Sequence, residues 1–283
     1  MDTQTTNEEI KKQQRETWNK FSPGWKKWEE QNNRFTSKAS QAIIDAVKLK
    51  DNYQVLDIAS GTGEPALSTA GIVKNSKVIL TDIAEDMLAV AKENAKQMGL
   101  NNIEIKICSA DALPFEDNFF DVVTCRFGFM FFPDIQKAAD EMYRVLKPGG
   151  IMSTAVWSLP EKNPFATTIM GVINKHVEMP PPSPNAPGMF RCAKPEFIAE
   201  FLKKSGFNNV SEHEVQLNFT ANSVDTYWNF MTELAAPVVA GMGKADDSTK
   251  KIIKEQVYEG AEKFMKDGEF SIPATALIVT AKK

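Results

Sequence analysis

Between Tyr53 and Trp157, short apolar runs rich in β-branched residues alternate with longer amphipathic stretches. This alternation predicts βαβ units, because parallel strands need a crossover helix between them. The expected strands cover 54–58, 77–81, 103–107, 122–125 and 151–156. The expected helices cover 66–73, 85–98 and 135–145, the last ending before Lys147-Pro148-Gly149-Gly150. The pattern indicates the α/β class, a doubly wound, Rossmann-like, mostly parallel sheet with helices on both faces.

The segments that flank this core predict additional helical parts. Before it, we expect a helix at 7–28, interrupted near Ser22-Pro23-Gly24, and a second amphipathic helix at 37–47. After it, an irregular loop is expected over 160–195, where prolines 180–182 and 184 cluster. The remaining expected elements are a helix at 194–205 ending at Gly206, a strand at 210–220, helices at 224–242 and 248–265, and a strand at 274–280.

These elements predict seven strands and two parts of the chain. Residues 1–52 are expected to form an N-terminal helical flap. Residues 53–283 are expected to form the main domain, with cap segments at about 158–195 and 222–268 that include a helical insertion before the last strand. The sequence contains no internal repeat that would suggest a solenoid.

The composition is that of a globular protein, with 42% hydrophobic and 25% charged residues. A net charge of −4 argues against a broad nucleic-acid surface, which needs clustered Lys and Arg. No signal-peptide or membrane-spanning stretch is found, so no membrane insertion is expected. Cys108, Cys125 and Cys192 lack metal-site spacing and leave an odd thiol, which favours the cytoplasm and predicts no metal site. The oligomeric state is left open.

The first predicted strand runs directly into a glycine-containing turn and then a helix, in the segment Val55-Leu56-Asp57-Ile58-Ala59-Ser60-Gly61-Thr62-Gly63-Glu64-Pro65. Glycines permit close approach of the backbone to a ligand, and the following helix N-terminus offers unpaired N–H groups. The segment predicts a nucleotide-like ligand at the carboxyl end of the first strand. It lacks the third glycine of the Gly-x-Gly-x-x-Gly pattern, which weakens the case for NAD.

Two further carboxylates follow successive strands. Asp82 ends the second strand about 20 residues after the turn. A carboxylate at that position accepts hydrogen bonds from both hydroxyls of a ribose. Asp111 follows the third strand and is a candidate acceptor for an adenine amino group. Either residue alone would be explained by helix capping. The ordered set of three strand-end features is what predicts adenosine recognition.

With these motifs in place, residues 53–157 resemble the core of class I methyltransferases that use S-adenosylmethionine (SAM). They are similar in particular to the branch containing ubiquinone/menaquinone-biosynthesis C-methyltransferases. The resemblance is carried by VLDIASGTGEPAL, VILTDIAEDMLAVAKENA, SADALPFEDNFFDVVTCRFGFMFFPD and EMYRVLKPGGIMSTAVW. One departure is Ala59, where many relatives have the first glycine of the turn.

The resemblance implies SAM as cofactor and assigns residues to each part of it. Around the methionine end it implies Asp57, Ala59, Ser60, Gly61 and Gly63. For the ribose and adenine it implies Asp82, Ile83, Met87, Asp111, Ala112 and Leu113. Cys125 and Arg126 are expected near the methionyl group, and the alternatives for Arg126 are an acidic acceptor, the SAM carboxylate or a neighbouring Asp.

The implied reaction is in-line transfer of the SAM methyl group to a small-molecule acceptor. The candidate acceptor-binding residues are Trp25, Phe127, Phe131, Trp157 and Arg191. Alignment and desolvation carry most of such a reaction, so a base is not obligatory, and neither His176 nor His213 is assigned a catalytic role. The catalytic residues, the acceptor and the methylated element stay open. The alternatives are an NAD-dependent oxidoreductase and a catalytically silent SAM-binding protein.

Overall fold

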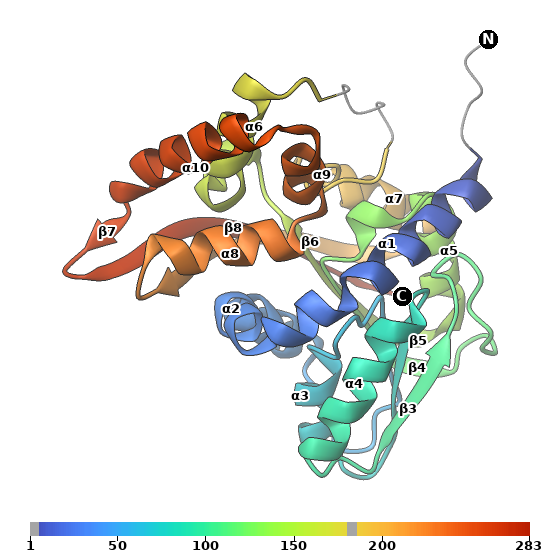
Figure 1. Cartoon of the computed structure of the whole chain (residues 1–283). Coiled ribbons are helices and arrows are strands. Elements are labelled where there is room, and N and C mark those ends of the chain that lie inside the picture. The colour runs from blue at the N-terminus through green and yellow to red at the C-terminus, as the bar shows by residue number, and fades with distance from the viewer. Residues whose placement is uncertain (1–5, 180–185) are drawn as a thin grey trace.

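A twisted sheet surrounded by helices forms the body of the protein in a computed structural model that describes residues 6–179 and 186–283 (Figure 1). Within these residues the sheet runs in the order β3-β2-β1-β4-β5-β8-β6, with the short β7 pairing with β8. Strands β1 to β5 are parallel to one another, and β8 is antiparallel to both β5 and β6. The expected α/β class and its seven-stranded, mostly parallel sheet are confirmed, with β7 as an added two-residue strand.

The core elements lie where the sequence pattern predicts them, although β4 and β5 are longer than the predicted 122–125 and 151–156. The strands are β1 (Val55–Ile58), β2 (Val78–Asp82), β3 (Ile103–Ile107), β4 (Phe120–Arg126) and β5 (Leu146–Trp157). The helices between them are α3 (Ala66–Ile72), α4 (Glu85–Gln97) and α5 (Ile135–Val145), with a 3₁₀ turn η1 (Phe129–Phe131) after β4. Strands β1 and β2 are buried along their whole length, as expected when helices cover both faces of a parallel sheet.

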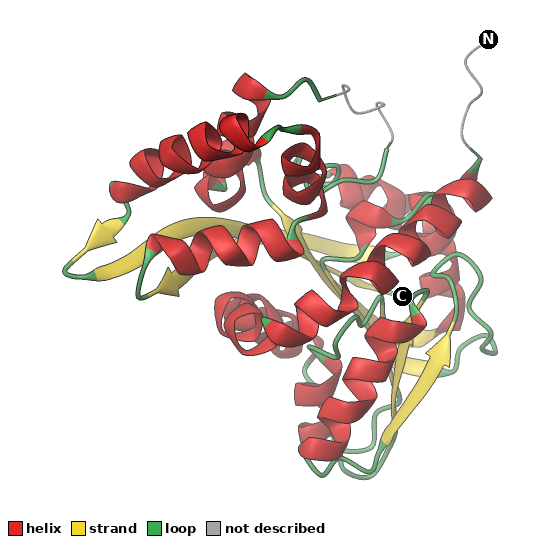
Figure 2. Ribbon diagram, in the orientation of Figure 1, coloured by secondary structure: helices red, strands yellow, loops and turns green. Residues whose placement is uncertain are grey.

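The C-terminal strands are longer than the sequence pattern predicts. β6 (Asn208–Ala221) and β8 (Glu269–Lys282) pair along 14-residue strands and extend past the parallel part of the sheet. The short β7 (Met265–Lys266) forms a hairpin with the start of β8. Helices gather on the extension, as Figure 2 shows for α6 (Pro164–His176), α8 (Val224–Leu234), α9 (Ala236–Lys244) and α10 (Asp247–Glu262).

The N-terminal helix is continuous, so the predicted interruption near Pro23 is wrong. α1 (Asn7–Lys27) passes through Pro23, which cannot donate to the carbonyl of Asn19. The hydroxyl of Ser22 donates to that same carbonyl at 2.9 Å and satisfies it. α2 (Glu29–Val47) follows and is longer than the predicted 37–47. α1 contacts α4 and α8, whereas α2 lies against β5, β6 and β8.

Two predictions for the C-terminal half are also wrong. The interval expected to be an irregular loop contains the turn η2 (Pro160–Lys162) and helix α6, which starts at Pro164, a position where proline costs no intrahelical bond. Prolines 180–182 and 184 lie outside the described residues. The helix expected over 224–242 is divided into α8 and α9 at Ala235, just before Pro237 in the first turn of α9. α7 (Phe197–Ser205) ends at Gly206, as predicted.

Candidate functional site

A cavity of about 520 Å³ lies over the carboxyl ends of the parallel strands. That volume is within the usual range for a small-molecule site. Its walls come from four regions of the chain: the strand ends of the core, one face of α1 with part of α2, residues 187–189, and helices α6, α8 and α9. From the core, the lining residues are Ile58–Thr62, Glu64, Asp82, Ile83, Met87, Cys108–Ala110, Arg126–Gly128, Phe131–Pro133 and Trp157.

The glycine turn after β1 is held in an unusual backbone conformation. Ala59 has φ 55° and Gly61 has φ 54°, so both adopt the left-handed conformation. Ser60 N–H donates to the Thr81 carbonyl at 2.9 Å, which ties the turn to β2. A side chain at Gly63 would meet the Leu67 side chain at 2.5 Å, so this glycine permits close packing of α3 against the turn. Gly63 itself does not line the cavity.

Asp82 joins the end of β2 to the glycine turn. Its carboxylate accepts from Gly61 N–H at 3.0 Å and from Ala84 N–H at 2.9 Å. Burial raises the pKa of Asp82, and these backbone hydrogen bonds act in the opposite direction. Because each carboxylate oxygen has a second lone pair, Asp82 retains acceptor capacity toward the cavity it lines.

Asp111 is engaged by a lysine that the sequence pattern had not singled out. Lys11 Nζ of α1 lies 2.8 Å from Asp111 Oδ2, with only 12% and 5% of the two side chains exposed. Ser109 Oγ donates to the other carboxylate oxygen at 2.6 Å. Burial acts to raise the pKa of Asp111, but the contacts with Lys11 and Ser109 outweigh it and hold that pKa below its usual value. Lys11 and Ser109 line the cavity, whereas Asp111 itself lies behind them.

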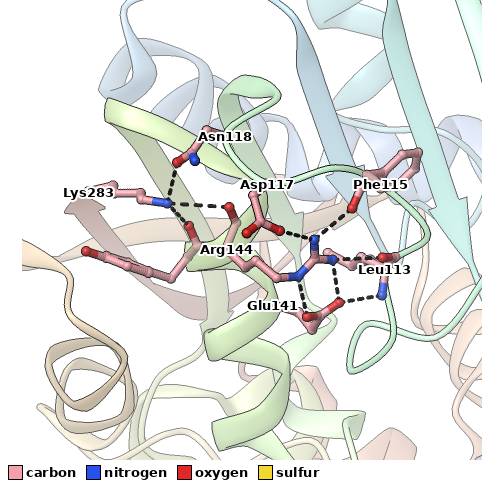
Figure 3. A network of polar contacts seen from close by, with 8 residues as sticks. Leu113, Phe115, Asp117, Asn118, Glu141, Arg144 and Lys283 are labelled. Atoms are coloured by element: carbon pink, nitrogen blue, oxygen red, sulfur yellow. Dashed lines mark hydrogen bonds and ion pairs between the residues drawn. The ribbon is translucent and has the colours of Figure 1, made fainter.

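The loop after β3 is fixed from behind by Arg144 of α5, as Figure 3 shows. The Arg144 guanidinium donates to the carbonyls of Leu113 and Phe115 at 2.9 and 2.7 Å. Glu141 completes the arrangement, because its carboxylate accepts from both Arg144 Nε and Leu113 N–H. These bonds hold Leu113 in the core, while Ala112 is exposed, and neither residue lines the cavity.

The fully buried Asp57 and the partly buried Arg126 form a charged region at the β1–β4 side of the site. Asp57 Oδ1 accepts from the Thr124 hydroxyl at 2.5 Å, while Oδ2 has no partner among the described residues. Burial raises the pKa of Asp57 to about 7. Arg126 donates to Thr36 Oγ1 at 2.8 Å and Ser40 Oγ at 3.0 Å, both on α2. Arg126 lines the cavity, but the fully buried Asp57 lies beneath it.

Aromatic side chains form much of the remaining wall. Phe127 has φ 57° and stacks on Trp157 with ring centroids 4.3 Å apart. Trp18 makes edge contacts with Trp25 at 5.8 Å and Phe131 at 5.1 Å. Trp25 Nε1 is buried without a partner among the described residues. The four predicted aromatic residues therefore meet around one cavity, as expected.

Two of the predicted side chains are directed elsewhere. Cys125 is fully buried in the core, close enough to Gly128 that a side chain there would meet its Sγ at 2.7 Å. Arg191 donates to the carbonyls of Phe132 and Pro133, so it supports the cavity wall without lining it. His176, bonded to Gln256, and His213 are exposed and do not line the cavity.

Several lining residues were missed by the sequence analysis. In α1 they are residues 11, 14, 17, 18 and 21, which lie with the predicted Trp25 on one face of the helix. That spacing was a usable signal, since three of the six lining residues of α1 are aromatic. From α2, α6, α8 and α9 the lining residues are Asn32, Phe35, Thr36, Phe165, Ala166, Met170, Phe230, Met231, Leu234, Ala236–Val238 and Ala240. They had no comparable signal, because the contacts depend on tertiary packing.

Comparison with known proteins identifies the same relationship that the motifs had suggested. The sequence model of the ubiE/COQ5 methyltransferase family matches residues 31–177. The ubiquinone/menaquinone biosynthesis C-methyltransferase UbiE of Escherichia coli K12 / DH10B is 39% identical over 125 residues. The protein of that name from Shigella boydii has the same identity over the same length. Each alignment covers 44% of this chain and 50% of the relative, so the chain spans about half the length of the curated relatives it matches.

Solved structures support the same fold. YcgJ from Bacillus subtilis has a TM-score of 0.57 at 22% identity, with 87% of this chain and 97% of that chain covered. A putative methyltransferase from Bacillus halodurans has a TM-score of 0.56 at 24% identity, with 86% and 98% covered. Within residues 6–179 and 186–283, none of the helices has the combination of length and apolar character that crossing a membrane requires.

Proposed function

The chain belongs to the ubiE/COQ5 methyltransferase family, and we propose that it transfers the methyl group of SAM to a small, largely apolar acceptor. The observation that carries this proposal is the continuity of the cavity. One and the same cavity extends from the glycine turn and Asp82 to the aromatic residues Phe35, Trp157 and Phe165. A donor and an acceptor bound in one cavity meet the positioning requirement of methyl transfer.

The residues present are chemically suited to SAM. The turn at Gly61 is open to the cavity, where an added side chain would meet the Met87 methyl at 3.3 Å. Asp82 offers acceptors for two ribose hydroxyls, and Glu64 has a buried carboxylate oxygen without a partner among the described residues. When bound, SAM supplies a methyl carbon already activated by its positive sulfur. We include the remaining predicted cofactor residues in this proposal, either as contacts with SAM or as supports of the loops that contact SAM.

The side chains of this chain would mainly orient the reactants and exclude water. The stacked rings of Phe127 and Trp157 offer a flat apolar surface, and aromatic faces also attract cationic groups such as a sulfonium. Trp25 is a candidate donor to a polar group of the acceptor. The described lining contains no histidine, which fits a reaction driven by alignment rather than by a histidine base.

The acceptor is proposed only as a chemical class. The relatives carry the name of a ubiquinone/menaquinone biosynthesis C-methyltransferase, and a planar quinone precursor is compatible with the aromatic lining. However, Trp18 and Trp25 precede the matched range 31–177, and the α8–α9 wall follows it. Part of the acceptor side of the cavity therefore lies outside the family-matched range, whereas Phe35, Phe127 and Trp157 lie within it.

We extend the proposal to the organisation and surroundings of the protein. Residues 1–52 would act as a flap, and 53–283 as the SAM-binding domain with cap segments at about 158–195 and 222–268. The support is that α1, α6, α8 and α9 all contribute to the cavity wall. The negative net charge and the odd number of cysteines support a small-molecule rather than nucleic-acid substrate and a cytoplasmic location.

Calorimetric titration of the full chain with S-adenosylhomocysteine (SAH), with NAD as control, tests the proposal without an identified acceptor. Micromolar binding of SAH together with no binding of NAD is the expected result. Preference for NAD, or no SAH binding, would refute the assignment. Methyl transfer to quinol, phenol and amine acceptors would then separate an active enzyme from a catalytically silent SAM-binding protein.

A further inference from the structure

Among the described residues that line the cavity, Glu64 is the one carboxylate whose role the sequence motifs did not assign. It follows Gly63 in the turn after β1 and lines the cavity. Its Oε2 is buried, yet among the described residues its carboxylate accepts no hydrogen bond and makes no ion pair. A buried carboxylate oxygen without a partner is costly, so it indicates a missing cationic or hydrogen-bonding group.

Arg126 presents the complementary group on the neighbouring strand. Its side chain is partly buried, and its contacts within the described residues are the hydroxyls of Thr36 and Ser40 rather than a carboxylate. Burial lowers the pKa of Arg126, and the negative charges of Glu64 and Asp57 oppose that change. The guanidinium carries five N–H donors, so donors remain for an anionic group in the cavity that Arg126 lines.

The charged side chains of Glu64 and Arg126 lie on the side of the cavity where the amino-acid end of SAM is expected. Asp57 of β1 is paired with Thr124 of β4, which places Arg126 beside the glycine turn. Asp82 lies on the opposite side of β1, at the end of β2, and Ser109 follows β3 beyond it. With the ribose at Asp82 and adenine toward Ser109, the amino-acid end of SAM lies toward β4.

Resting on the proposed function, we infer that Glu64 binds the α-ammonium group of SAM while Arg126 binds its α-carboxylate. Together the two side chains bind both charged groups of the methionine moiety, and we call this pair the charge clamp. Such a clamp selects SAM and SAH over adenosine thioethers that lack either charged group. Glu64 would thereby be a specificity-determining residue that contacts the cofactor away from the methyl group.

The test pairs changes in the protein with changes in the ligand. Calorimetry would compare SAH, its desamino analogue and its descarboxy analogue on wild-type, Glu64→Gln and Glu85→Gln proteins. Glu85 is an exposed glutamate at the start of α4 and serves as the matched control. Thermal unfolding of each variant verifies that it is folded.

Loss of a charge-assisted hydrogen bond should weaken binding about 10- to 100-fold. We expect that loss when either Glu64 is changed or the ammonium is removed, and no further loss when both are absent. Arg126→Gln should show the same coupling with the descarboxy analogue. Glu85→Gln should bind every ligand as the wild type does.

Three outcomes would contradict the inference. If Glu64→Gln weakens SAH and desamino-SAH equally, Glu64 supports the turn without contacting the ammonium. If Glu64→Gln binds SAH as tightly as wild type, or wild type binds desamino-SAH and SAH equally, the clamp does not exist. These results leave SAH binding, and hence the proposed function, intact. Failure of the wild type to bind SAH would overturn both.

Discussion

Replacing Asp82 by alanine removes the carboxylate that links the end of β2 to the glycine turn and to the cavity. In the proposed complex this group accepts hydrogen bonds from two ribose hydroxyls. Each such bond to a charged acceptor contributes about 1.5–3 kcal/mol, so their loss costs about 3–6 kcal/mol. At 1.4 kcal/mol per tenfold, affinity for SAH should fall about 10²- to 10⁴-fold.

The same substitution has a predictable structural cost. Gly61 N–H and Ala84 N–H, which lie 3.0 and 2.9 Å from the Asp82 carboxylate, both lose their acceptor. Because Asp82 borders the cavity, water can replace part of the lost bonding. The free energy of unfolding should therefore fall by about 1–3 kcal/mol, which leaves the variant folded and measurable.

The assay is calorimetric titration with SAH and with its 2′-deoxy and 3′-deoxy analogues. Glu85→Ala, an exposed change three residues away, is the control and should bind as wild type does. The deoxy analogues should bind the wild type more weakly than SAH, and Asp82→Ala should barely distinguish the three ligands. A folded Asp82→Ala protein that binds SAH within threefold of the wild type would refute the ribose assignment.

Three further changes test individual features of the site. Ala59→Gly should raise the free energy of unfolding by about 1 kcal/mol in urea titrations, because Ala59 has φ 55° and glycine tolerates that conformation; a decrease would mean that the methyl group contributes more through packing. Burial raises the pKa of Asp57 to about 7, so the folded state binds more protons than the unfolded state and stability falls as pH rises from about 4 to about 7. Asp57→Asn should lack this dependence, and its stability relative to wild type should increase by up to about 1.4 kcal/mol per pH unit over that interval; parallel stability curves would contradict the buried titration. Lys11→Met should tighten SAH binding several-fold in calorimetry, because it frees the Asp111 carboxylate for the adenine amino group; weaker binding would instead mean that Lys11 holds α1 over the ligand.

The core elements could be predicted because their signals are local. Residues 103–107 and 135–145 form the expected strand and helix at the predicted bounds, and α7 ends at the glycine chosen as its stop. The proximity of the glycine turn and Asp82 could also be predicted, because the ends of parallel strands meet at one edge of the sheet. The hydrogen bond from Gly61 N–H to the Asp82 carboxylate joins the turn directly to the end of β2.

The rest depended on contacts that sequence spacing does not encode. Continuity of α1 through Pro23 required the hydroxyl of Ser22 to satisfy a freed carbonyl, which proline rules alone do not reveal. Arg126 is bonded to Thr36 and Ser40, which lie 90 and 86 residues earlier in the chain. Likewise, the pairing of Lys11 with Asp111 brings together residues from opposite ends of the first half of the chain.

The position of β8 between β5 and β6 has a consequence for how a newly synthesised chain folds. The ribosome makes β5 and β6 before β8, although β8 is the strand that joins them. Until residues 269–282 emerge, β5 has an unpaired edge, the kind of surface on which chains associate wrongly. Helices α6 and α8 rest on β8 and β6, so the acceptor side of the cavity should form after the nucleotide side. We expect the nascent protein to be able to hold the proposed methyl donor before it can hold an acceptor.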